Sequence, residues 1–320
     1  MRRTSPSGAR VLAVVGARVL EALFVALLLA SLVFFALRLL PGDPAQLILG
    51  DEASPAELAR VRATLHLDQP LFVQYLGFLR GLATLDLGDS LRQPGTHAMA
   101  RVAAAVVPTG ALAAIAVGLG TVAGLAAAVL ASGPWLGGLT RWVERGLVAA
   151  AAAPLVAFAP VLTWALAVRA RVVPLPGDPD TPAAGLLFAS ALLAIPLAAH
   201  LGRIARASLA DVARAQFLVT AQAKGVAPAR VWVVHALAAV AGPITTVVAT
   251  QLGALLGGAV VLERMFERRG LGTLILEAYA TRDLPVLEGA VVATGVLFIV
   301  AQAAGVAVHT AIDPRARSNA

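Results

Sequence analysis

Residues that could catalyse a reaction are few in this 320-residue chain, and their spacing fits no common catalytic site. The only lysine, Lys224, follows Ala223, whereas a phosphate-binding loop needs a lysine directly after glycine to reach nucleotide phosphates. The chain contains no Gly-x-Ser-x-Gly nucleophile turn, no His-Glu-x-x-His zinc motif and no cysteine. Its five histidines have no ligand-like spacing: His66, His97, His200, His235 and His309. We therefore expect no enzyme activity, no catalytic residue, and no metal or cofactor bound by this chain.

A polar stretch late in the chain carries strong helix signals. Ser208 and Asp211 resemble a capping box, which predicts a helix from about Leu209 to Lys224. A lysine in the last turn suits the negative end of the helix dipole, and Gly225 suits the left-handed position that follows a helix. The expected helix therefore ends at a sharp turn.

The same stretch predicts a second helix that begins at Pro228 and continues through Arg230, Trp232 and His235. Apolar and small residues recur along the first helix at helical spacing: Leu209, Val212, Ala213, Phe217, Thr220 and Ala221. An amphipathic helix of this kind either lies on a lipid surface or docks onto a partner protein. The pattern alone leaves both possibilities open.

The elements that must position these residues are membrane spans. Hydrophobic residues make up 59% of the chain and charged residues only 13%, and the mean hydropathy is +0.84. One soluble core of this size could not hide so much apolar surface, so lipid is the expected solvent. The net charge of +7 comes without interleaved aromatic residues, which argues against nucleic-acid binding.

A spanning helix needs about 20 mostly apolar residues because its backbone groups must be satisfied internally. Six segments qualify: Val19 to Leu40, Val102 to Ala131, Gly146 to Val168, Gly185 to Leu201, Ala236 to Leu262 and Gly289 to Ala311. The fourth is the shortest and extends backward through Pro182. The fold class predicted is an all-α polytopic membrane protein with six transmembrane helices.

Proline and charged residues inside the spans could mark function, but simpler explanations fit them. We interpret Pro108, Pro154, Pro160, Pro196 and Pro243 as simple kinks, because neighbouring helices can bond the freed carbonyls.

The interiors of spans two to six carry no Asp, Glu, Lys or Arg. In the first span, Glu21 and Arg38 lie near the ends, where long side chains reach the interface. Transport energy would then come from a partner, or from ion sites lined by backbone carbonyls.

The arginines predict the orientation. With the N-terminus inside, segments 1–18, 132–145, 202–235 and 312–320 are cytoplasmic, and they hold 13 of the 25 basic residues in a shorter total length than the outside segments. Both termini are therefore expected in the cytoplasm. The arginine-rich start could belong to a signal peptide, but no small-x-small site follows the apolar run, so we expect an uncleaved first span.

The first outside segment, 41–101, is long enough for a small extracytoplasmic subdomain. Ser54, Pro55 and Glu57 form an N-cap, a first-turn proline and a capping-box acid, which predicts a helix through about Leu65.

Several stretches together resemble the permease subunits of ABC importers, in the dipeptide and oligopeptide family. Thr220-Ala221-Gln222-Ala223-Lys224-Gly225, with His235-Ala236-Leu237 and Pro243 downstream, is similar to the family's cytoplasmic coupling loop. Further similar stretches are Leu40-Pro41-Gly42-Asp43-Pro44, Leu67-Asp68-Gln69-Pro70-Leu71 with Gln74-Tyr75-Leu76, Asp86-Leu87-Gly88-Asp89-Ser90, Gly270-Leu271-Gly272, Arg282-Asp283-Leu284-Pro285-Val286 and Asp313-Pro314-Arg315. Gln216, Val219 and Arg269 depart from the family pattern, which leaves the choice of ATPase and the shape of the last outside loop open.

This resemblance implies a type I ABC importer fold and a division of the chain into four parts. These are 1–40 (cytoplasmic N-terminus and first span), 41–101 (extracytoplasmic segment), 102–311 (permease core with coupling loop 203–235) and 312–320 (cytoplasmic tail).

The resemblance also implies an inner-membrane location and a set of partners: a second homologous permease, two cytoplasmic ATPases that bind ATP and Mg²⁺, and an extracytoplasmic substrate-binding protein. The residues expected to contact or transmit to the ATPases are Phe217, Thr220, Ala221, Ala223, Lys224, Gly225, Arg230 and His235. The alternatives are an ion-coupled secondary transporter and a membrane scaffold without transport.

Overall fold

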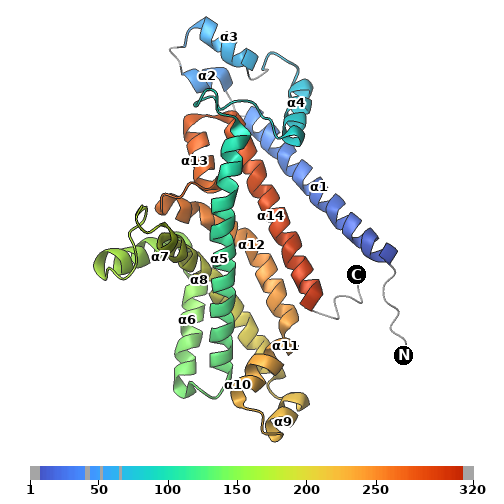
Figure 1. The fold of residues 1–320 in the computed structure, drawn as a ribbon, viewed down its shortest axis with the longest axis vertical. Coiled ribbons are helices and arrows are strands. Elements are labelled where there is room, and N and C mark those ends of the chain that lie inside the picture. Colours follow the sequence, from blue (N-terminus) through green and yellow to red (C-terminus); the bar gives the residue numbers. More distant parts are fainter. Residues whose placement is uncertain (1–7, 40–43, 51–52, 65–66, 313–320) are drawn as a thin grey trace. The chain divides into compact units, whose positions relative to one another are not determined.

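Helices make up most of the computed structural model, which describes residues 8–39, 44–50, 53–64 and 67–312 (Figure 1). The α-helices are α1 (Gly8–Arg38), α2 (Pro44–Leu49), α3 (Pro55–Thr64), α4 (Leu71–Thr84), α5 (Ala98–Ser132), α6 (Thr140–Ala152), α7 (Leu155–Thr163), α8 (Pro182–Val212), α9 (Gln216–Ala223), α10 (Pro228–Arg230), α11 (Leu237–Ala239), α12 (Ala241–Met265), α13 (Leu271–Thr281) and α14 (Leu284–Ile312). A 3₁₀ turn, η1 (Gly137–Leu139), and two π-helical segments, η2 (Trp164–Arg169) and η3 (Val231–Ala236), complete the set. Within these ranges no β-strand forms, and one isolated bridge joins Asp89 and His97.

The chain forms two compact units, each with its own core. Unit 1 comprises Met1–Pro108 and Arg269–Ile299, and unit 2 comprises Thr109–Arg268 and Val300–Ala320. In unit 1, Phe34 of α1 packs with Phe78 of α4 and Val292 of α14, and a second cluster joins the first turns of α5 to α13 and α14. In unit 2, one cluster joins α5, α7, α8 and α12, and another joins the ends of α5 and α8 to α9, η3 and α12.

The long apolar helices confirm most of the predicted spans. Five helices of the described chain are long and apolar enough to cross a bilayer: α1 over Leu20–Arg38, α5, α8, α12, and α14 over Leu284–Gly305. The fourth span does extend back to Pro182, where α8 begins. The fifth begins later than predicted, at Ala241, because Val240 leaves the helical conformation. Leu40 and Asp313 to Arg315 lie outside the described residues.

The third predicted span, Gly146 to Val168, is not one straight helix. Residues Gly137–Ala152 and Leu155–Arg169 are bent by 112° at the break between them, so they form either one broken span or a re-entrant pair. Ala153 is extended (φ −77°, ψ 125°), as expected for a residue held away from the helical region by the proline after it. Pro154 is also extended (ψ 134°) and is the N-cap of α7, which begins at Leu155. Interpreting Pro154 as a simple kink was therefore wrong, whereas Pro108, Pro160 and Pro196 do lie inside helices.

Two glycines bring the backbones of α5 and α8 into contact in unit 2. A Cβ on Gly124 would lie 2.7 Å from the carbonyl oxygen of Ala198, and one on Gly202 would lie 3.2 Å from the carbonyl oxygen of Gly124. Small residues at a crossing allow membrane helices to pack at close range when no hydrophobic force drives them together. A side chain at Gly124 would therefore force the backbone of α8 to shift, and one at Gly202 would press on α5 and on Leu147.

The capping box at the start of α3 is formed as predicted. The backbone N–H and the hydroxyl of Ser54 both donate to Oε2 of Glu57, at 2.9 and 2.7 Å, and the N–H of Glu57 donates to Oγ of Ser54. These bonds favour the ionised carboxyl and hold the pKa of Glu57 below its ordinary value of 4.5. The cap is therefore complete near neutral pH and weakens only in acid, as the carboxyl becomes protonated.

Candidate functional site

The predicted coupling segment is a short helix between two sharp turns. Helix α8 ends at Val212, and α9 begins after Ala215, whose extended backbone (ψ 138°) redirects the chain. Gly225 follows α9 with φ +76°, a conformation that glycine adopts without steric cost. The N–H groups of Lys224 and Val226 donate hydrogen bonds to the carbonyls of Thr220 and Ala221, so backbone hydrogen bonds cap the last turn of α9.

The predicted end of this helix is right, but its predicted start is wrong. Ser208 and Asp211 form no cap, because both lie in the last turns of α8. Leu209 is fully buried in unit 2, and this packing extends α8 beyond the end of the predicted span. The predicted helix from Leu209 to Lys224 is therefore two helices, and the predicted loop 203–235 begins inside the first of them.

Helix α9 packs against unit 2 mainly through Leu218, with Ala221 partly buried beside it, and leaves other apolar side chains exposed. Leu218 is only 2% exposed and belongs to the cluster that contains Leu209 and Val231, whereas Phe217 is 48% and Val219 54% exposed. Leu218, which the predicted apolar face omitted, is thus the residue that positions the helix. Exposed apolar side chains on a short helix between longer helices form a surface that a partner can bind.

The structure places the eight predicted coupling residues in one continuous segment of unit 2. Phe217, Thr220, Ala223, Lys224, Gly225 and Arg230 are exposed, and Ala221 and His235 are partly buried. The hydroxyl of Thr220 donates to the carbonyl of Gln216, one turn earlier in α9. Beside Gly225 lies an open hollow whose walls come from the turn after α5 (Ser132 to Pro134), the end of α9 and Trp232 of η3.

The last two predicted coupling residues, Arg230 and His235, lie in an irregular helix. Pro228 begins α10, as predicted, and the chain then takes a π-helical turn at Val231–Ala236, which contains His235, before α11. π-helical turns within α-helices are often found at functional sites.

Unit 1 contains a set of buried and partly buried charged residues that local sequence patterns did not reveal. The guanidinium of Arg38 lies 3.8 Å from the centre of the Phe34 ring, donates from Nε to Gln74 at 3.1 Å and pairs through Nη1 with Glu288. Glu288, at the start of α14, is only 5% exposed. The prediction that Arg38 snorkels to the interface did not include these protein partners, which hold the side chain in place.

A second buried carboxylate fastens the loop before α5 to the turn between α13 and α14. Asp283 is fully buried and accepts hydrogen bonds from the Ser90 hydroxyl, the Leu91 N–H at 3.1 Å and Arg101 Nη1 at 3.3 Å. The stretches Asp86 to Ser90 and Arg282 to Val286, noted only for their family-like positions, thus lie against each other. A third buried carboxylate, Glu263 of α12, accepts a hydrogen bond from Thr109 of α5 in unit 2.

The comparisons with known proteins agree with this architecture. Residues 91–318 match the family described as binding-protein-dependent transport system inner membrane component, and residues 11–95 match the N-terminal membrane component of such systems. A putative peptide transport system permease protein of Brucella abortus is 34% identical over 315 residues, covering 94% of this chain and 97% of that protein. A glutathione transport system permease protein of Pectobacterium atrosepticum is 33% identical over 297 residues, covering 91% and 94% of the two chains.

These helices define a multi-pass membrane protein of the α-helical class. The chain belongs to the family of inner-membrane components of binding-protein-dependent transport systems, and it is an ABC importer permease of the peptide family. Permease components of this family do not hydrolyse ATP themselves.

Proposed function

We propose that this permease forms half of the pathway by which peptides or similarly small solutes enter the cell. Relatives of nearly full length are named as peptide and glutathione transport permeases, which supports this substrate class. The other half would come from a second homologous permease, and an extracytoplasmic binding protein would deliver the solute. Two cytoplasmic ATPases would bind ATP and Mg²⁺.

The coupling contact in this proposal is α9 with its flanking turns, within segment 203–235. The observation that carries it is the division of α9 into one buried anchor, Leu218, and two exposed apolar side chains, Phe217 and Val219. A partner that binds the exposed side would move the anchor, and Leu218 shares its cluster with residues of α8 and α12. Movement of α9 would thereby reach two spanning helices.

Replacing Gly225 with valine is expected to uncouple ATP hydrolysis from uptake. The left-handed backbone costs a β-branched residue about 1–2 kcal/mol, so the turn after α9 would change its course. In proteoliposomes that contain the full transporter, uptake of a labelled dipeptide or of glutathione should fall about tenfold while ATP hydrolysis continues.

Gly137 provides a matched control for the Gly225 variant. It also has positive φ, and a Cβ on it would meet nothing within 4 Å, as at Gly225, but it lies outside the coupling segment. Gly137→Val should therefore insert and transport close to normally. Unchanged uptake per ATP in Gly225→Val would count heavily against α9 as the coupling contact.

The proposal also requires α9 and loop 86–97 to face opposite sides of the membrane. The chain has no cysteine, so K224C and Q93C each introduce a single thiol at an exposed position. A membrane-impermeant maleimide added to intact spheroplasts should label Q93C at once and K224C only after permeabilisation. Labelling of K224C from outside would overturn the orientation and the proposed coupling contact with it.

A further inference from the structure

Helix α4 contacts α1 inside the part of α1 that spans the membrane. The hydroxyls of Tyr75 and Ser31 share a hydrogen bond at 2.6 Å, and the ring centres of Tyr75 and Phe34 lie 5.3 Å apart. The apolar span of α1 runs from Leu20 to Arg38, so Ser31 lies about 10 Å along the helix from the end of that span. Tyr75 of α4 therefore lies at a depth where the span is surrounded by apolar solvent.

Helix α14 gives the same depth independently. Phe78 of α4 is only 6% exposed and belongs to the cluster that contains Phe34 of α1 and Val292 of α14. The apolar span of α14 begins at Leu284, so Val292 lies about 12 Å along the helix from its start. All of these helices belong to unit 1. Two spans therefore place the inner face of α4 inside the membrane rather than in the water beyond it.

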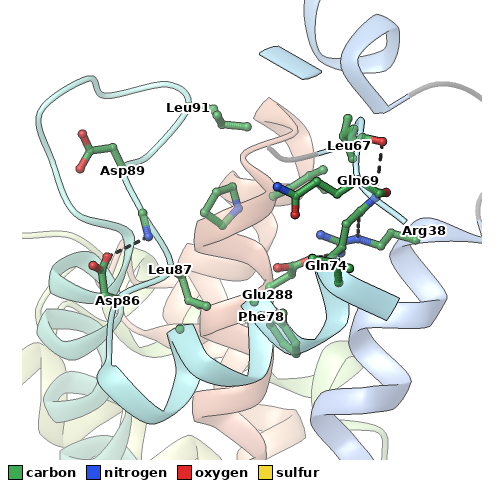
Figure 2. Close-up of a pocket in the computed structure, with 16 residues that line it drawn as sticks. Arg38, Leu67, Gln69, Gln74, Phe78, Asp86, Leu87, Asp89, Leu91 and Glu288 are labelled. Carbon is green, nitrogen blue, oxygen red and sulfur yellow. Dashed lines mark hydrogen bonds and ion pairs between the residues drawn. The ribbon is translucent and has the colours of Figure 1, made fainter. Parts of the chain in front are cut away.

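The two faces of α4 have the reverse of the polarity expected for a helix in water. Its polar side chains point inward: Gln74 accepts a hydrogen bond from Arg38 at 3.1 Å, and Tyr75 bonds to α1. Figure 2 shows Gln74 on the side of α4 that faces Arg38. The outer face is apolar instead, since Phe72 is 68% and Leu76 49% exposed. A helix on a water-covered surface places its apolar stripe inward and its polar side chains outward.

Helix α3, in the same stretch between α1 and α5, shows the ordinary pattern. Its exposed side chains include Glu57, Arg60 and Arg62, whereas its two large apolar side chains, Leu58 and Val61, are partly buried. The apolar outer face is therefore a property of α4 and not of the whole stretch.

The exposed apolar surface of α4 continues onto the span beside it. Phe35 of α1 is 36% exposed and its ring centre lies 5.3 Å from that of Tyr75, and Leu32, one turn earlier in α1, is also exposed. Leu85, which follows α4, is 69% exposed and has the left-handed backbone (φ +56°) that glycine adopts more easily. An apolar solvent that covers α1 therefore reaches α4 without crossing a polar boundary.

We infer that α4 is embedded in the bilayer, in the leaflet that contains the C-terminal end of α1, with Phe72 and Leu76 against lipid acyl chains. Its 14 residues are too few to span the membrane, and helices that lie in the interface bury an apolar face in this way. Arg80, the only charged residue of α4, is exposed, and its long side chain can reach the head groups. This position of α4 does not depend on which solute the permease carries.

Spin labels test the position of α4. Because the chain has no cysteine, F72C and L76C each provide a single attachment site on the outer face. The full-length permease is reconstituted in proteoliposomes with the subunits that co-purify with it. Power saturation then measures how often the label collides with O₂, which dissolves in hydrocarbon, and with a water-soluble nickel chelate. The ratio of O₂ to nickel collisions at F72C and L76C should exceed that at Q93C, in the exposed loop, by about tenfold, because hydrocarbon excludes polar solutes.

Two further sites provide matched controls. Phe24 is 65% exposed in the span of α1, and Ala59 is exposed on α3, so the label at F24C should behave as at F72C and the label at A59C as at Q93C. Equal collision with the nickel chelate at F72C and Q93C would overturn the embedding, because α4 would then lie in water. Rare collision with both reagents at F72C would overturn it too, since another subunit rather than lipid would then cover the outer face. Both of these results would leave the proposed function standing.

Discussion

Asp283→Ala is expected to lower the free energy of unfolding by about 3–5 kcal/mol. The variant removes a fully buried carboxylate that accepts hydrogen bonds from Ser90, Leu91 and Arg101. The Arg101 guanidinium would lose its buried counter-charge, and the loop before α5 would lose its attachment to the α13–α14 turn. Denaturant unfolding of the purified permease in detergent measures the loss, and hydrogen exchange of residues 88–97 should rise in parallel.

Glu277→Ala provides the matched control for this prediction. Glu277 also pairs with Arg101, at 3.8 Å, but its side chain is 59% exposed. An exposed ion pair of this kind contributes about 1 kcal/mol or less because water and salt screen it. If Asp283→Ala and Glu277→Ala lower the free energy of unfolding equally, burial of Asp283 does not determine how much it contributes to stability.

Breaking the pair between Arg38 and Glu288 is expected to cost a similar amount. Arg38→Met leaves the carboxylate of Glu288 buried without its counter-charge, which destabilises by about 3–5 kcal/mol, and it also removes the bond to Gln74. The double variant Arg38→Met/Glu288→Leu should recover most of that loss, because two apolar side chains of similar volume can replace a buried ion pair.

A double-mutant cycle separates these contributions. The single variants and the double variant are unfolded under the same conditions, and a large favourable coupling energy between the two sites is expected. If the losses in free energy of unfolding of the two single variants simply add in the double variant, Arg38 and Glu288 contribute to the stability of unit 1 independently of each other.

Local signals predicted those parts of the fold that depend on nearby residues. The five long apolar runs became helices because a backbone in lipid must satisfy its own hydrogen bonds. The Ser54 to Glu57 capping box, the turn at Gly225 and the helix start at Pro228 each depend on residues within three or four positions. Patterns at this range can be identified without knowledge of the tertiary structure.

Distant contacts decided the remaining features. The end of α8 was predicted too early because burial of Leu209 in unit 2, rather than local capping, sets its length. Arg38 was interpreted as an interface residue because its partner, Glu288, lies 250 positions away. The link between Ser90 and Asp283 likewise spans 193 positions. Leu218 was passed over because the start of α9 was misplaced, which shifted the predicted apolar face.

The contact between Gly124 and Gly202 determines how movement passes through unit 2. Where side chains separate two helices, a shift of one can be absorbed by rotamer changes in the layer between them. Gly124 and Gly202 provide no such layer, since each backbone touches the other directly. When α9 moves α8, the segment of α5 that crosses α8 at these glycines should therefore move with it.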